Sequence, residues 1–85
     1  MTVEFIGPLK TLVDKRSCTV ELEDKTMVSE LVNKLKEEMF SGKDSKDMSN
    51  LLIMLNGKEV SVLNGLQTML HDSNIITLIP AAHGG

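Results

Sequence analysis

Few residues in this chain carry side chains that could do chemistry, and those few lie far apart in the sequence. Among 85 residues there are one cysteine, Cys18, and two histidines, His71 and His83. This set offers no spacing typical of a metal site, since zinc sites need three or four ligands at short intervals. The remaining candidate is the ending Gly84-Gly85. It places a carboxylate on a backbone without Cβ atoms, the narrowest and most adaptable backbone available to a chain.

A carboxylate is a poor acyl donor because its leaving group would be oxide, so it must be activated before transfer. The chain has no glycine-rich nucleotide-binding loop and no general acid–base pair, so we expect no enzyme activity of its own. His83 has two interpretations: proton transfer at the adjacent carboxyl group, or a solvated or partner-contacting tail residue. His71 precedes a turn and is expected at the surface. Cys18 alternates with Val20 and Leu22, which favours a small buried hydrophobe over a nucleophile.

The composition is typical of one small folded domain. A chain of 85 residues has no room for a barrel or a two-domain nucleotide-binding enzyme, nor for a deep catalytic cavity. Leu, Ile, Val and Phe supply 26 residues, enough for a core. Nine basic residues against 12 acidic ones, with no Trp or Tyr, argue against DNA binding. A single cysteine, no signal-like start and only short apolar runs favour the cytoplasm and argue against a membrane span.

Hydrophobic periodicity predicts an α+β domain. The apolar residues between Val28 and Met39 recur at helical spacing, and Thr26 is placed to cap this helix. Alternating or short apolar segments predict strands at 2–6, 18–23, 51–55, 58–62 and 75–79. We expect a mixed sheet of four to five strands packed on one main helix, with the first and last strands parallel at its centre. Residues 1–79 then form the domain, and 80–85 form a flexible tail.

The last predicted strand is apolar on both faces, although one helix covers only one face of a small sheet. If the helix covers Ile76 and Leu78, the opposite face keeps unburied apolar side chains beside the tail. Two interpretations stay open: a protein interface, or side chains covered by loops in a tighter core. The expected patch consists of Ile75, Ile79, Leu52 and Met54.

Four segments carry a family resemblance: Phe5-Ile6-Gly7-Pro8-Leu9, the helix entry 26–31, Leu55-Asn56-Gly57 and the segment 70–85. In these the chain resembles the ubiquitin-like β-grasp sulfur carriers, which include the small subunit of molybdopterin synthase, the ubiquitin-related modifier and the small archaeal modifier proteins. The ending is most similar to the ubiquitin-related modifier, whereas Ile79-Pro80 is more similar to the synthase subunit, so the branch stays open. The chain has Asp72-Ser73-Asn74 where the family usually has Asp-Gly-Asp, which makes a positive φ costlier at that turn.

The resemblance implies a ubiquitin-like β-grasp fold and a chemistry for the tail. An E1-like adenylating enzyme would join the Gly85 carboxylate to AMP, with ATP used by that partner and no cofactor bound by this chain. A sulfur donor would then displace AMP, leaving a thiocarboxylate for molybdopterin (molybdenum cofactor) biosynthesis or tRNA thiolation, with the large subunit of molybdopterin synthase as a further partner. The alternatives are conjugation of Gly85 to lysines of target proteins, and a non-transferred ubiquitin-like binding module. The expected chemical residues are Gly85 and Gly84, and the expected partner-binding residues are Ile75, Ile79, Leu52, Met54, Pro80 and His83.

Overall fold

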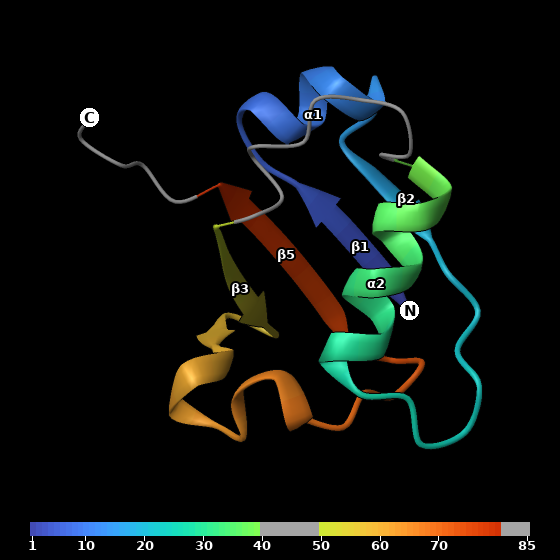
Figure 1. The fold of residues 1–85 in the computed structure, drawn as a ribbon, viewed down its shortest axis with the longest axis vertical. Coiled ribbons are helices and arrows are strands. Elements are labelled where there is room, and N and C mark those ends of the chain that lie inside the picture. Colours follow the sequence, from blue (N-terminus) through green and yellow to red (C-terminus); the bar gives the residue numbers. More distant parts are fainter. Residues whose placement is uncertain (40–49, 81–85) are drawn as a thin grey trace.

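The computed structural model describes residues 1–39 and 50–80. The elements in chain order are β1 (Thr2–Phe5), α1 (Pro8–Val13), β2 (Ser17–Thr19), α2 (Val28–Met39), β3 (Leu51–Leu55), β4 (Lys58–Glu59), the 3₁₀ turns η1 (Val60–Val62) and η2 (Gly65–Gln67), and β5 (Ile75–Pro80). The strands form a five-stranded sheet in the order β2-β1-β5-β3-β4, and α2 lies across one face of it (Figure 1). The expected α+β architecture, a mixed sheet on one main helix, is confirmed.

The centre of the sheet is the parallel pair of the first and last strands, as the sequence predicts. Thr2 pairs with Ile75, and the register continues to Phe5 and Leu78. The strand β3 lies antiparallel on the other side of β5. Both central strands therefore run toward the end of the sheet at which α1 lies (Figure 1).

The core fills the space between the central strands and α2. Val3 and Phe5 of β1 and Ile76 and Leu78 of β5 are fully or almost fully buried. The helices contribute Leu9, Val28, Leu31, Val32 and Leu35. Alternate residues of each strand and the helical stripe therefore meet in one layer, as their periods of two and 3.6 residues predict.

The connection between the first two strands contains a helix that the sequence reading missed. Gly7-Pro8 ends β1 as expected, but Pro8 also begins α1, at a position where its missing N–H costs nothing. Leu9 and Val13 are buried one helical turn apart. The strand β2 is shorter than predicted, because its pairing with the start of the chain ends at Val20. The Val20 N–H donates to the Met1 carbonyl at 2.8 Å, and the Met1 amino group donates to the Val20 carbonyl at 2.9 Å.

Two further local predictions are corrected. The strand expected at 58–62 stops at Glu59, because Val60 turns into the core and begins η1. Thr26 does not act as the expected helix cap: its hydroxyl donates to the Glu23 carbonyl at 2.7 Å. The entry to α2 is instead stabilised by Glu30, whose carboxylate accepts the Met27 N–H at 3.0 Å.

The turn at 72–74 needs no glycine. The non-glycine residues with positive φ among those described are Asp14, Lys25 and Asn56, all outside this turn. Asn74 closes the turn instead: its side-chain oxygen accepts the His71 N–H at 2.7 Å, and its own N–H donates to the His71 carbonyl at 2.9 Å. The departure from the family's Asp-Gly-Asp pattern therefore introduces no left-handed strain here.

Asn56 is expected to hold the hairpin turn against β5. It has a left-handed φ of 49°, and its side-chain oxygen accepts the Ile75 N–H at 2.8 Å. Asn56→Ala should lower the free energy of unfolding by about 2 kcal/mol, since it loses both the hydrogen bond and the tolerance for this φ. Asn56→Gly loses only the hydrogen bond and should cost about 1 kcal/mol. Urea denaturation checks both variants, and equal losses would contradict the backbone part of this explanation.

Candidate functional site

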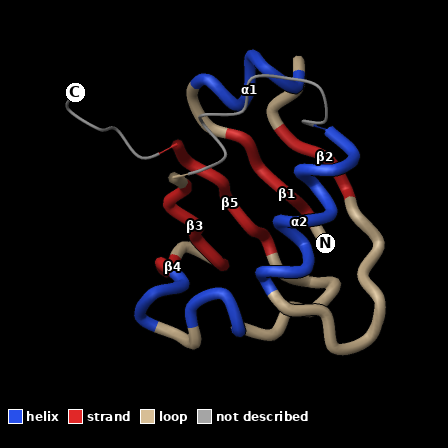
Figure 2. The backbone as a smooth tube through the Cα atoms, in the orientation of Figure 1, coloured by secondary structure: helices blue, strands red, loops and turns tan. Residues whose placement is uncertain are grey.

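The last described residue, Pro80, lies at the end of the sheet where β1 also finishes. The strand β5 ends at Pro80, which pairs with Leu51 of β3, and its neighbour β1 runs in the same direction (Figure 2). Pro80, the first residue of the expected tail, is thus part of the strand. The expected chemical residues Gly84 and Gly85, and His83 with them, lie outside the described residues.

The outer face of the sheet, opposite α2, carries the predicted patch residues. Paired residues of neighbouring strands point to the same side, so the pairing of Leu52 with Ile79 puts both on one face. Met54 pairs with Thr77 and lies on this face too. Ile76 and Leu78, which alternate with them, are fully buried on the helix side. Leu52, Met54 and Ile79 are therefore brought together as the sequence predicts.

Ile75 and Pro80 lie apart from this group. Ile75 is four residues before Ile79, about 13 Å along the strand. Between them Thr77 donates its hydroxyl to the Glu4 carboxylate at 3.0 Å, so a polar pair interrupts the apolar surface. Pro80 alternates with Ile79, which places it on the helix side of the sheet. Neither residue belongs to a continuous surface with the others.

Ile6 is an apolar residue of this surface that sequence reasoning missed. It is 43% exposed, and its N–H donates to the Leu78 carbonyl at 3.1 Å, next to Ile79. The signal was present, because Ile6 follows the inward Phe5 and is out of phase with the buried residues of β1. Ile75 is 44% exposed, whereas Leu52, Met54 and Ile79 are half-buried. We define the outer-face patch as Ile6, Leu52, Met54 and Ile79.

Positive charge lies beside the outer-face patch, at the same end of the sheet. Lys10 of α1 and Arg16, just before β2, line a hollow of about 330 Å³ together with Ile6, Gly7 and the single acidic residue Glu4. Gly7 has a φ of 61° and open space where a Cβ would be. A partner that covers the outer-face patch would therefore meet two basic groups and one carboxylate at its rim.

Cys18 and His71 lie where their structural roles were expected, against the core and at the surface. Cys18 is half-buried against the core, and this burial raises the pKa of its thiol, partly opposed by the charge of Lys15. A raised pKa leaves less thiolate at neutral pH, which does not favour a nucleophile. His71 is exposed at its turn. Within residues 1–39 and 50–80, no three His, Cys, Asp or Glu side chains lie close enough to hold a metal ion, and no helix is long and apolar enough to cross a bilayer.

Several solved structures share this fold. The small archaeal modifier protein 1 from Methanosarcina acetivorans matches with a TM-score of 0.77 at 21% identity, covering 99% of this chain and 94% of that one. Urm1 from Trypanosoma brucei gives 0.76 at 21% identity, covering 99% and 93%. One chain of the complex of subunits 1 and 2 of molybdopterin-converting factor from Helicobacter pylori gives 0.64 at 24% identity, covering 99% of this chain and 96% of that one. No curated protein sequence is similar enough to this chain to count as a match.

The five-stranded mixed sheet packed on one main helix is a ubiquitin-like β-grasp fold. Residues 3–85, almost the whole chain, match the ThiS family. The chain belongs to this family of small ubiquitin-like sulfur carriers and modifiers, whose members are carrier proteins rather than enzymes. The resemblance of the sequence to these carriers is confirmed.

Proposed function

We propose that this protein is a sulfur carrier whose working group is the Gly85 carboxylate. One observation carries the proposal: the family match runs to residue 85 and so includes the Gly84-Gly85 ending. The domain supports it, because β5 ends at Pro80, five residues before the carboxylate. The folded part would serve to present that carboxylate to larger partners.

The proposed chemistry has two steps, both in a partner's active site. An E1-like enzyme directs the Gly85 carboxylate to attack the α-phosphorus of ATP, forming the acyl-adenylate and releasing pyrophosphate. A sulfur donor at the oxidation level of sulfide then attacks the carbonyl carbon. The bond from carbon to the AMP oxygen breaks, AMP leaves with the electron pair, and a thiocarboxylate remains. Receiving pathways would be molybdopterin biosynthesis or tRNA thiolation, in the cytoplasm.

Adenylation by an E1-like enzyme is tested by isotope exchange between pyrophosphate and ATP. The full chain is mixed with an E1-like enzyme from the same cells, and exchange that depends on this chain is the expected result. A version lacking Gly84 and Gly85 serves as the control and should give none. Exchange at equal rates with both chains would contradict the proposed attachment point, and no exchange with either would favour the binding-module alternative.

The outer-face patch is proposed as the surface that the activating enzyme covers. Leu52→Asp combined with Ile79→Asp should weaken binding of that enzyme by about 100-fold, because two charges would be buried against an apolar partner surface. Ile75→Asp, on the same strand but outside the patch, is the matched control and should bind within a few-fold of the original. Titration calorimetry measures all three. Equal losses of affinity in the control and the double variant would contradict the proposal that the enzyme covers this patch.

Conjugation to lysine is the alternative that the comparisons favour, since one of the structures of this fold is named a modifier. It shares the adenylate and differs in the final nucleophile, an amine in place of sulfur. Lysine side chains of other proteins bearing a branched Gly-Gly remnant would identify it. For the sulfur-carrier route we propose the large subunit of a molybdopterin synthase as a further partner; the complex of two subunits of molybdopterin-converting factor from Helicobacter pylori supports a pairing of this kind.

A further inference from the structure

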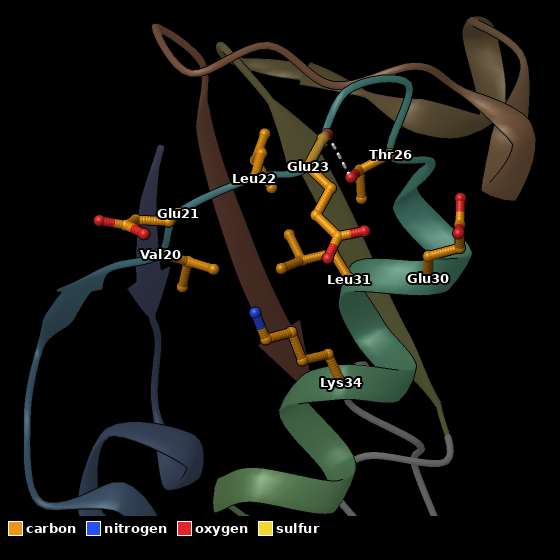
Figure 3. Close-up of a pocket in the computed structure, with 8 residues that line it drawn as sticks. All are labelled: Val20, Glu21, Leu22, Glu23, Thr26, Glu30, Leu31 and Lys34. Atoms are coloured by element: carbon orange, nitrogen blue, oxygen red, sulfur yellow. Dashed lines mark hydrogen bonds between the residues drawn. The ribbon is translucent and has the colours of Figure 1, made fainter.

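A groove runs between the edge of the sheet and α2, on the side of the sheet away from the outer-face patch. It consists of two adjoining hollows of about 240 and 290 Å³, which share Val20, Glu21 and Lys34 in their linings. Val20 and Leu31 face each other across the first hollow, and Lys34 reaches over it from α2 (Figure 3). Cys18 and Leu35 line the second hollow. The half-buried side chains of Cys18, Val20, Leu22 and Met39 supply the accessible apolar part of this lining, beside polar groups of similar extent.

Backbone N–H and C=O groups beside this groove point away from the sheet and can bind an added strand. β2 is the edge strand of the described sheet, and beyond it the chain continues as the extended segment 20–23 (Figure 3). Val20 exchanges both hydrogen bonds with Met1, and the Phe5 N–H donates to the Arg16 carbonyl at 2.8 Å. In an antiparallel pair these groups alternate, so the N–H and C=O of Thr19 and Glu21 point to the free edge. Within residues 1–39 and 50–80, no hydrogen bond to the backbone of Glu21 is formed.

The rim of the groove is acidic. Glutamates at 21, 23, 30 and 38 line the two hollows, against the single lysine Lys34. Glu23 holds its carboxylate over the hollow beside Leu31, whereas Glu21 points away from the helix toward the open side (Figure 3). None of the four forms an ion pair with another described residue. The potential at this rim therefore favours a positively charged occupant.

We propose that this groove binds an extended peptide segment with aliphatic residues in its middle and Lys or Arg on both sides. The segment adds a strand to the free edge of β2 and 20–23, which supplies main-chain hydrogen bonds. Alternate aliphatic side chains, about 7 Å apart along a strand, enter the two hollows. The flanking basic side chains lie against Glu21, Glu23 and their neighbours. The peptide is a segment of another protein.

This binding site goes beyond the proposed carrier function and does not depend on it. The groove lies at the β2 edge on the helix side, whereas the outer-face patch lies on the other side of the sheet, on β3, β5 and the end of β1. An occupant of the groove therefore leaves the patch and the end of β5 accessible. A protein held in the groove could stay bound while the activating enzyme engages the other face.

The test is an NMR titration of the full chain with a short synthetic peptide that has a Val-Ile-Val-Ile centre and two lysines at each end. We expect shifts confined to 18–23 and the facing side of α2, with slower exchange of the Glu21 amide proton. A peptide with glutamates in place of the lysines should bind about tenfold more weakly. N-methylation of the peptide residues that face the edge should abolish binding, whereas N-methylation of the alternate residues should not.

The charge preference is tested on the protein. Glu21→Lys combined with Glu23→Lys should reverse the order of the two peptides, while the matched pair Glu37→Lys and Glu59→Lys, with the same change in net charge outside the groove, should keep it. Several results would overturn the proposal. These are no shifts at millimolar peptide, shifts centred on the outer-face patch, equal affinity for both peptides, or the same shifts on concentrating the protein alone, which would identify a second copy as the occupant.

Discussion

Gly85→Ala should lower the rate of transfer from this protein by about 100-fold while leaving its fold intact. The proposed partners enclose the terminal carboxylate in a channel shaped for bare backbone, and a Cβ at the reacting residue displaces the carboxylate from the attacking geometry. A displacement of about 1 Å can cost a reaction two orders of magnitude. The measurement is single-turnover formation of the adenylate and of the thiocarboxylate, with the melting temperature of each variant recorded alongside.

Ala81→Ser is the matched control for this prediction. It also enlarges one tail residue by a single heavy atom, but four residues away from the carboxylate. We expect it to react at the wild-type rate. Wild-type transfer by Gly85→Ala would contradict the role given to the bare ending, and equal slowing of both variants would show a general effect of the tail.

Leu78→Ala should have the largest effect on stability, a loss of about 3 to 5 kcal/mol. Leu78 is fully buried in β5, between β1 and β3, where neighbouring strands hold the backbone and keep the cavity from closing. A domain of this length has an unfolding free energy of only about 4 to 13 kcal/mol. The variant should therefore lose between about a quarter and all of this free energy of unfolding. Urea denaturation followed by circular dichroism measures the loss.

Val62→Ala is the comparison for the core variant. Its side chain is 72% exposed in η1, so its removal should change the free energy of unfolding by less than about 0.5 kcal/mol. A loss below about 1 kcal/mol for Leu78→Ala would mean that the centre of the sheet is less tightly packed than the burial of Leu78 indicates.

The regular parts of this fold follow from its sequence because each carries a clear period. Val3 and Phe5 alternate with polar residues, which predicts a strand and its buried face. The apolar stripe that begins at Val28 predicts a helix and its buried face in the same way. The parallel pairing of β1 with β5 then follows from topology, since both strands are needed at the centre. By contrast, α1 has only six residues, too few for a firm period, and its stability comes from Leu9 and Val13 in the core.

The sequence predicted those features of the candidate site that depend on the alternation of side chains within one strand. It could not predict those that depend on which residues pair between strands. Apolar residues on both faces of 75–79 correctly indicated an outer surface, and Leu52 and Ile79 lie together on it. Which residues interrupt that surface depends on strand pairing, so the contact of Thr77 with Glu4 could not be foreseen. Ile6 was visible in the sequence as a residue out of phase with its strand.

At the β2 edge the hydrogen-bonded pairing with β1 is shorter than the extended segment of the chain. Pairing with β1 ends at Val20, yet the chain stays extended for three more residues before it turns toward α2. The alternation at 18–23 predicted a longer strand, and the side chains do keep that alternation. What is missing is a hydrogen-bonded partner for the extended segment, which is why the proposed peptide site lies there.

The most direct test of the carrier function is the intact mass of the protein recovered from its native cells under conditions that preserve thioacids. The account predicts a population in which one terminal oxygen is replaced by sulfur, with fragmentation placing the change at Gly85. Chains that all retain an unmodified carboxylate, under conditions in which a synthetic thiocarboxylate standard survives, would contradict it.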